Sequence, residues 1–181
     1  MLTINDVVLL PIDIENSNYE YQKALTAKLD SLDTAFNQEI INEIVLWKVN
    51  RYSAISDEVL QLINTIKKSH TSIDENLTEM ILSKLLSEDQ KGIRLAIAST
   101  ILRFKNPKIY QIIDQRVYRF IYGKELSYSS KSIKEQIAIY LRYLEKLREI
   151  CNEYNFDFDQ ADRILYTLDK KQNSEEKLKG Y

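Results

Sequence analysis

Few residues in this chain interrupt regular structure, and few can bind a metal. The 181 residues include three glycines and two prolines, which favours long helices joined by short links. A single cysteine, Cys151, excludes an internal disulfide and a four-cysteine iron–sulfur cluster. Because His70 is the one histidine, a structural zinc site lacks its ligands, and we expect neither a metal nor a cofactor.

Long hydrophobic runs are absent as well. No apolar stretch approaches the roughly 20 residues that span a bilayer. The N-terminus lacks the basic start and the small-residue cleavage site of a signal peptide. Apolar residues make up 44% of the chain and charged residues 29%, as in ordinary soluble globular proteins. We therefore expect a cytoplasmic protein with no membrane partner, whose oligomeric state the sequence does not indicate.

Apolar residues recur at helical spacing along most of the chain. Helices are expected over residues 19–33, 36–52, 56–68, 72–86, 93–104, 114–122, 132–151 and 159–170. Ser72 with Glu75, and Ser132 with Glu135, have the spacing of a capping box, in which each side chain bonds a backbone amide of the other residue. With no internal repeat and no linker, the pattern predicts one all-α domain over residues 1–181. An N-terminal arm is expected at 1–17 and a frayed tail at 171–181.

Charge is unevenly distributed, and residues 91–124 are the extreme case. This segment, the cationic strip, contains eight Lys and Arg residues and one acid, Asp114, for a net charge of +7. Because the whole chain is at −2, the remainder carries −9. A strip so poor in acids favours a phosphate backbone as its partner.

The cationic strip also carries a motif. Gly92 begins the pattern Gly-Ile-x-x-x-x-Ala, an aliphatic helix follows, and Ile-Ile-Asp-x-x-Val-x-Arg ends at Arg119. This combination resembles the helix-hairpin-helix DNA glycosylases of the endonuclease III type and the bacterial 8-oxoguanine DNA glycosylase-like proteins. Gly92 matches the first hairpin glycine, Ala98 the hairpin alanine and Asp114 the catalytic aspartate. The resemblance implies a compact multi-helix fold of this type, with double-stranded DNA as the partner.

Two positions depart from the family's pattern and narrow the implied chemistry. Arg94 replaces the second hairpin glycine, which in the family lets backbone amides approach a DNA phosphate. The guanidinium of Arg94 can instead bind a phosphate directly. Ala96 stands where bifunctional members place the Schiff-base lysine. The resemblance therefore implies a monofunctional enzyme without lyase activity.

The implied reaction is hydrolysis of the N-glycosidic bond of a damaged base. Positive charge develops on the deoxyribose, and the Asp114 carboxylate would stabilise it and orient or deprotonate a water molecule. Aromatic faces usually hold a base that has left the stack. The candidate DNA contacts are Lys91, Gly92, Arg94, Arg103 and Arg119, and the candidate pocket aromatics are Trp47, Tyr52, Tyr110 and Tyr118.

Plainer interpretations stay open from the sequence. Asp114 begins a helix and is equally explained as an N-cap. The cationic strip can be a solvated face, and Trp47 a core residue. Two further hypotheses remain. One is a catalytically inactive DNA-binding relative, suggested by Arg94 and Ala96; the other is a helical protein-interaction module whose cationic strip docks an acidic partner.

Overall fold

The computed structural model describes residues 22–49 and 53–178. Within these ranges there are eight α-helices, one short 3-10 helix and no β-strand, which confirms the all-α fold class. No helix in these ranges combines the length and the apolar composition that a bilayer crossing requires. The chain divides into two compact units, Met1–Tyr52 and Ser53–Tyr181. That the chain acts as one domain stays a prediction.

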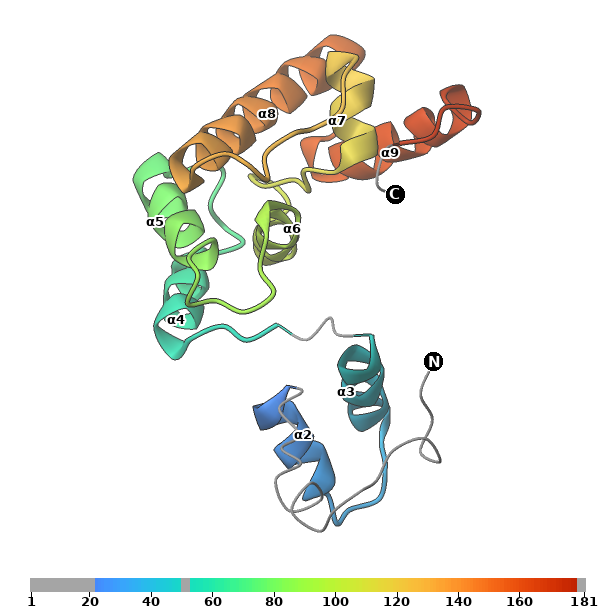
Figure 1. The fold of residues 1–181 in the computed structure, drawn as a ribbon. Helices are drawn as coiled ribbons and strands as arrows, with labels where there is room; N and C mark the ends of the chain where they lie inside the picture. Colours follow the sequence, from blue (N-terminus) through green and yellow to red (C-terminus); the bar gives the residue numbers. More distant parts are fainter. Residues whose placement is uncertain (1–21, 50–52, 179–181) are drawn as a thin grey trace. The chain divides into compact units, whose positions relative to one another are not determined.

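The described part of the first unit is a pair of helices, α2 (Lys23–Asp30) and α3 (Gln38–Lys48), drawn in blue in Figure 1. Trp47 joins the two helices, because its indole Nε1 donates a hydrogen bond to Thr26 Oγ1 at 2.9 Å. This contact agrees with the interpretation of Trp47 as a packing residue. The predicted N-terminal arm, 1–17, lies outside the described residues.

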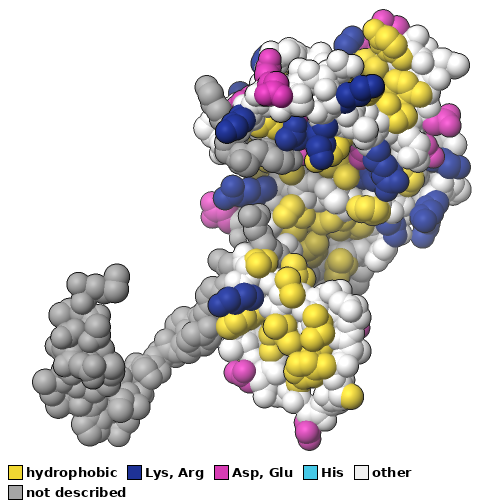
Figure 2. All heavy atoms as spheres, turned by 90° about the vertical axis from the view of Figure 1, so that its right-hand side faces the viewer, with side chains coloured by type: hydrophobic (Ala, Val, Ile, Leu, Met, Phe, Trp, Pro, Cys, Tyr) yellow, Lys and Arg dark blue, Asp and Glu magenta, His cyan; other side chains and the backbone are white. Residues whose placement is uncertain are grey.

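The surface of α3 is unusually apolar. None of its residues is buried. Large apolar side chains on the helix and at its ends are exposed, namely Phe36, Ile41, Val45, Leu46 and Val49. Figure 2 shows apolar side chains gathered on this unit. The helical spacing of Ile40, Ile41, Ile44 and Val45 predicted the helix correctly without indicating what packs on it.

The second unit contains the other helices around one core. They are α4 (Asp57–Thr65), α5 (Glu75–Leu85), α6 (Leu95–Lys105), α7 (Gln115–Tyr122), α8 (Ile133–Tyr154), the 3-10 helix η2 (Phe158–Gln160) and α9 (Ala161–Gln172). In Figure 1, α5 packs against the first half of the long helix α8, and α7 lies beside α9. The core side chains without exposed surface include Ile81, Leu82, Leu85, Leu95, Leu102, Ile113, Val117, Leu144 and Leu147.

The starts of two helices test the capping predictions. Ser132 and Glu135 form the predicted capping box at the start of α8, where the Glu135 carboxylate accepts from the Ser132 amide at 2.9 Å. The prediction for Ser72 and Glu75 is wrong. Asp74 is the N-cap of α5 instead, and Glu75 is already the first helical residue.

The described end of the chain makes contacts with the rest of the second unit. Helix α9 continues to Gln172, and beyond it Leu178 is buried with 7% of its surface exposed. Arg119 on α7 donates a hydrogen bond to the Glu176 carbonyl oxygen at 3.0 Å. That residues 171–181 form a frayed tail stays a prediction.

Candidate active site at Asp114

Asp114 lies where an extended segment ends and α7 begins. It is the N-cap of α7, since its Oδ1 accepts a hydrogen bond from the Arg116 amide at 2.7 Å. The residue is half-buried. The N-cap interpretation is therefore correct, and the cap also fixes the orientation of the carboxylate.

Two buried tyrosines of α8 hold the backbone that leads into Asp114. The Tyr140 hydroxyl donates to the Gln111 carbonyl oxygen at 2.9 Å, and the Tyr143 hydroxyl donates to the Ile112 carbonyl oxygen at 2.6 Å. Burial raises the pKa of both tyrosines well above its ordinary value, so both hydroxyls keep the protons that these bonds need. The segment before Asp114 is thus fixed to the core.

Side chains of α6 and α9 hold the same segment. Ser99 Oγ accepts from the Ile113 amide at 3.2 Å, and Asp162 Oδ2 accepts from the Ile112 amide at 3.3 Å. Ser99 and Ile113 have no exposed surface. Three helices therefore fix residues 111–113, and this arrangement is termed the 111–113 clamp.

Asp114 lines a cavity of about 380 Å³ between α7 and α9. The other lining residues are Ile112, Val117, Asp162, Arg163, Tyr166 and Thr167. Tyr166 supplies the aromatic ring, and the Arg116 guanidinium lies 6.0 Å from the ring centre. Sequence reasoning missed Tyr166 because it lies on α9, far along the chain from Asp114. Its i, i+4 spacing from Asp162, which puts both on one helix face, was the available signal.

Among the predicted pocket aromatics, Tyr110 and Tyr118 belong to the second unit and do not line this cavity. Trp47 belongs to the first unit, where its indole donates a hydrogen bond to Thr26 on α2. Tyr52 lies outside the described residues. Tyr118 lines a different cavity, and Tyr110 is a core residue with 1% of its surface exposed. The structure thus favours neither Tyr118 nor Tyr110 as the aromatic ring beside Asp114.

Three of the predicted DNA contacts lie in the turn before α6 and are exposed, namely Lys91, Gly92 and Arg94. Ile93, between them in sequence, is buried. Gly92 has a φ of 76°, in the left-handed region that glycine adopts without strain. The Ala54 amide donates to the Lys91 carbonyl oxygen at 3.2 Å, so a backbone bridge anchors the turn. The structure thus keeps these three residues together at one basic turn.

Arg103 has a different environment from the one predicted. Its surface is 6% exposed, and its Nη2 donates to the Asp159 carbonyl oxygen at 3.0 Å. Its Nε lies 3.7 Å from Asp162 Oδ2. These partners hold the guanidinium between α6 and the start of α9, and the DNA contact of Arg103 stays a prediction.

Arg119 forms an ion pair with Asp169 on α9. Its Nε and Nη2 donate to the two carboxylate oxygens of Asp169 at 2.8 Å and 2.9 Å, and Arg116 approaches the same carboxylate at 3.3 Å. Hydrogen bonding to Asp169 raises the pKa of Arg119. That Arg119 contacts DNA stays a prediction. Asp169, an acid remote in sequence, offsets part of the charge of the cationic strip, at Arg116 and Arg119.

The second unit thus carries a half-buried carboxylate on a clamped backbone, a cavity with one aromatic ring, and a basic turn before α6. Among the described residues, no group of His, Cys, Asp and Glu side chains is arranged to hold a metal ion. Comparisons of the chain with protein-family models, with curated proteins and with solved structures find no match in any of the three.

Proposed function

We propose that this chain is a DNA-binding protein of the helix-hairpin-helix glycosylase type and that it hydrolyses the N-glycosidic bond of a damaged base. The observation that supports the proposal best is the position of Asp114, whose carboxylate lines a cavity while the 111–113 clamp holds the backbone before it. Catalytic groups need such rigid support. The turn at Gly92 before α6, and Asp114 at the start of α7, are consistent with the fold that the motif implies.

In this proposal, the cavity between α7 and α9 receives the flipped base. Its volume of about 380 Å³ is within the range of roughly 300 to 1,000 Å³ for small-ligand sites. Tyr166 offers a ring face to the base. The Asp114 carboxylate stabilises the positive charge that develops on the deoxyribose and orients the attacking water. Because Ala96 replaces the Schiff-base lysine, no strand cleavage is expected.

The basic turn of Lys91, Gly92 and Arg94 is the proposed contact with the DNA backbone. Lys91 and Arg94 are exposed, and neither has an ion-pair partner among the described residues. The left-handed conformation of Gly92 shapes the turn that carries them. Because Arg103 and Arg119 have partners within the chain, we expect a contact that neutralises about two phosphates and weakens strongly with salt.

The reaction is tested on duplexes that each carry one damaged base, with heat or alkali used to reveal abasic sites. We expect base release from at least one lesion, and its loss in Asp114→Asn, because asparagine keeps the N-cap but lacks the charge. Asp74→Asn is the matched control, since Asp74 caps α5 in the same way and lies outside the cavity. A wild-type chain that releases no base from a broad panel of lesions would refute the reaction.

A separate measurement decides whether DNA is the partner. Duplex affinity should fall as salt rises, and the slope of log affinity against log salt should decrease by about 2 when Lys91→Gln and Arg94→Gln are combined. Salt-dependent binding without base release would point to the non-catalytic DNA-binding relative. Affinity that does not respond to salt would exclude both DNA hypotheses and favour the protein-interaction module.

A further inference from the structure

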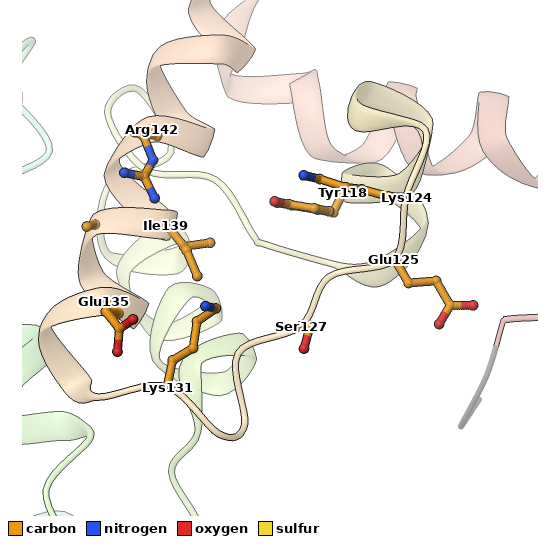
Figure 3. Close-up of a pocket in the computed structure, with 9 residues that line it drawn as sticks. Tyr118, Lys124, Glu125, Ser127, Lys131, Glu135, Ile139 and Arg142 are labelled. Atoms are coloured by element: carbon orange, nitrogen blue, oxygen red, sulfur yellow. The ribbon is translucent and has the colours of Figure 1, made fainter.

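A second cavity, of about 520 Å³, lies between α7, the connection that follows it and α8. Figure 3 shows the residues around it. It shares no lining residue with the cavity beside Asp114. Tyr118, which does not reach the Asp114 cavity, lines this one, and its hydroxyl points toward α8.

Three cations from different places in the chain line this second cavity. Lys124 follows α7, Lys131 precedes α8, and Arg142 lies on α8. Figure 3 shows Lys124 extending from the α7 side toward α8, and Lys131 reaching into the space between them. Among the described residues none of the three has an ion-pair partner, whereas Arg119 is neutralised by Asp169. Unneutralised positive charge is therefore gathered at this cavity.

Two acids, Glu125 and Glu135, also line the cavity and differ in where their carboxylates are held. Glu125 directs its carboxylate away from the cavity in Figure 3. Glu135 is committed to the start of α8, because its Oε2 accepts from the Ser132 hydroxyl at 2.7 Å and from the Ser132 amide at 2.9 Å. These hydrogen bonds lower the pKa of Glu135. Glu135 therefore stays ionised and offsets part of the charge, but the three cations of the lining exceed its two acids by one charge, which favours an anionic ligand.

The connection that carries Lys124 and Lys131 is held in place. Gln115 and Leu126 exchange two hydrogen bonds, both at 2.8 Å, between the Gln115 side chain and the Leu126 backbone. Leu126 is buried, with 6% of its surface exposed. The connection is thus anchored to the first turn of α7, and a preformed site loses less conformational entropy when a ligand binds.

We propose that this cavity binds the phosphate group of a phosphorylated ligand. Arg142, Lys124 and Lys131 supply charge-assisted hydrogen bonds to the phosphate oxygens, and the Tyr118 hydroxyl adds a neutral donor. The site does not involve Asp114, so the inference goes beyond the proposed function. The phosphate can belong to a nucleic-acid strand, to a free nucleotide or to inorganic phosphate, since the same chemistry recognises all three.

Titration calorimetry of the full chain with four probes tests the proposal. The probes are inorganic phosphate, a nucleoside monophosphate, a single-stranded oligonucleotide with a 5′-phosphate, and the same oligonucleotide with a 5′-hydroxyl. Binding of either small probe would show that a free phosphate ligand suffices. A preference of about tenfold for the 5′-phosphate would indicate a strand end, and equal binding of both oligonucleotides would indicate backbone phosphates.

Matched variants show whether the binding occurs in this cavity. Arg142→Gln should raise the dissociation constant about tenfold or more for every probe that binds, because it removes a charged donor. Lys134→Gln removes an exposed cation in the first turn of the same helix, outside the cavity, and should change the constant less than about twofold. The inorganic-phosphate arm separates this site from the glycosylase proposal, because that probe offers no base to the Asp114 cavity. Absence of binding by every probe, or an equal loss in Lys134→Gln, would overturn the proposal.

Discussion

Arg119 on α7 and Asp169 on α9 form an ion pair with two parallel hydrogen bonds. The bonds are 2.8 Å and 2.9 Å long, and Asp169 has no exposed surface. Pairs of this geometry are stronger and more directional than single contacts. Because Asp114 opens α7 and Tyr166 lies on α9, the pair also sets the distance between the two walls of the Asp114 cavity.

Asp169→Asn should lower the free energy of unfolding by about 3 kcal/mol, because it leaves Arg116 and Arg119 without their buried counter-charge. Denaturant unfolding followed by circular dichroism measures the change. The control is Glu149→Gln, which removes the exposed pair with Lys146 and should barely move the midpoint. A midpoint for Asp169→Asn equal to that of the wild type would contradict the role of the pair.

The same pair makes stability depend on pH in a defined direction. Burial acts to raise the pKa of Asp169, but hydrogen bonds from Arg119, Asn173 and Arg116 outweigh it, and the pKa lies below its ordinary value. The stabilisation is therefore fully present above the unfolded-state pKa of about 3.9 and is lost as pH falls through the folded-state pKa. The stability difference between wild type and Asp169→Asn should shrink below about pH 4, measured by urea unfolding at a series of pH values. A difference that stays constant would count against this linkage.

Asp114→Ala and Asp114→Asn separate the structural role of Asp114 from its proposed chemical role. Alanine removes the acceptor of the Arg116 amide and should cost about 1 kcal/mol of folding stability, whereas asparagine keeps an acceptor and should cost much less. Thermal unfolding of both variants provides the comparison. Equal destabilisation by the two would mean that the carboxylate charge, and not the cap, stabilises α7.

Tyr143→Phe should weaken the 111–113 clamp. The substitution leaves the half-buried Ile112 carbonyl oxygen without its hydroxyl donor and should cost about 1 kcal/mol. If Asp114 is catalytic, base release should fall as well, measured on the same samples. Tyr154→Phe is the control, since Tyr154 is 68% exposed and should change neither quantity. Unchanged stability in Tyr143→Phe would show that the clamp does not depend on this bond.

Cys151 should react slowly with thiol reagents while the chain is folded. Burial raises its pKa to about 11, and 5% of its surface is exposed. At pH 8, about one thiol in a thousand is then the reactive thiolate. We expect labelling by a thiol-reactive dye to be at least about 100-fold faster in denaturant than in buffer. Similar rates in both conditions would show that the thiol is accessible in the folded chain.

Helical spacing predicted every helix of the described chain, but not where each begins. Apolar periodicity marks the interior turns of a helix, whereas its first residue depends on which side chain reaches a free amide. At α5 both Ser72 and Asp74 were available, and Asp74 accepts from the Leu77 amide at 3.0 Å. At α8 the predicted N-cap, Ser132, is the one that the structure has, and its capping box with Glu135 is confirmed.

Local sequence also led to Asp114, but not to its surroundings. The motif and the helix start that identify Asp114 are both contained in a short segment. The sequence did not indicate the partners of Arg103 and Arg119, because Asp159 and Asp169 lie 56 and 50 residues further along the chain. A charge count over one segment cannot include acids that tertiary folding brings beside it.

The bonds that Ser99, Tyr140 and Tyr143 make to residues 111–113 form together with the core. The backbone before Asp114 therefore loses its conformational entropy when the chain folds, and not when a ligand binds. If the Asp114 cavity binds a ligand as proposed, its affinity depends on contacts inside the cavity, with little contribution from loop closure. A substitution of Ser99, Tyr140 or Tyr143 would then reduce that affinity in a chain that still folds, without contacting the bound molecule.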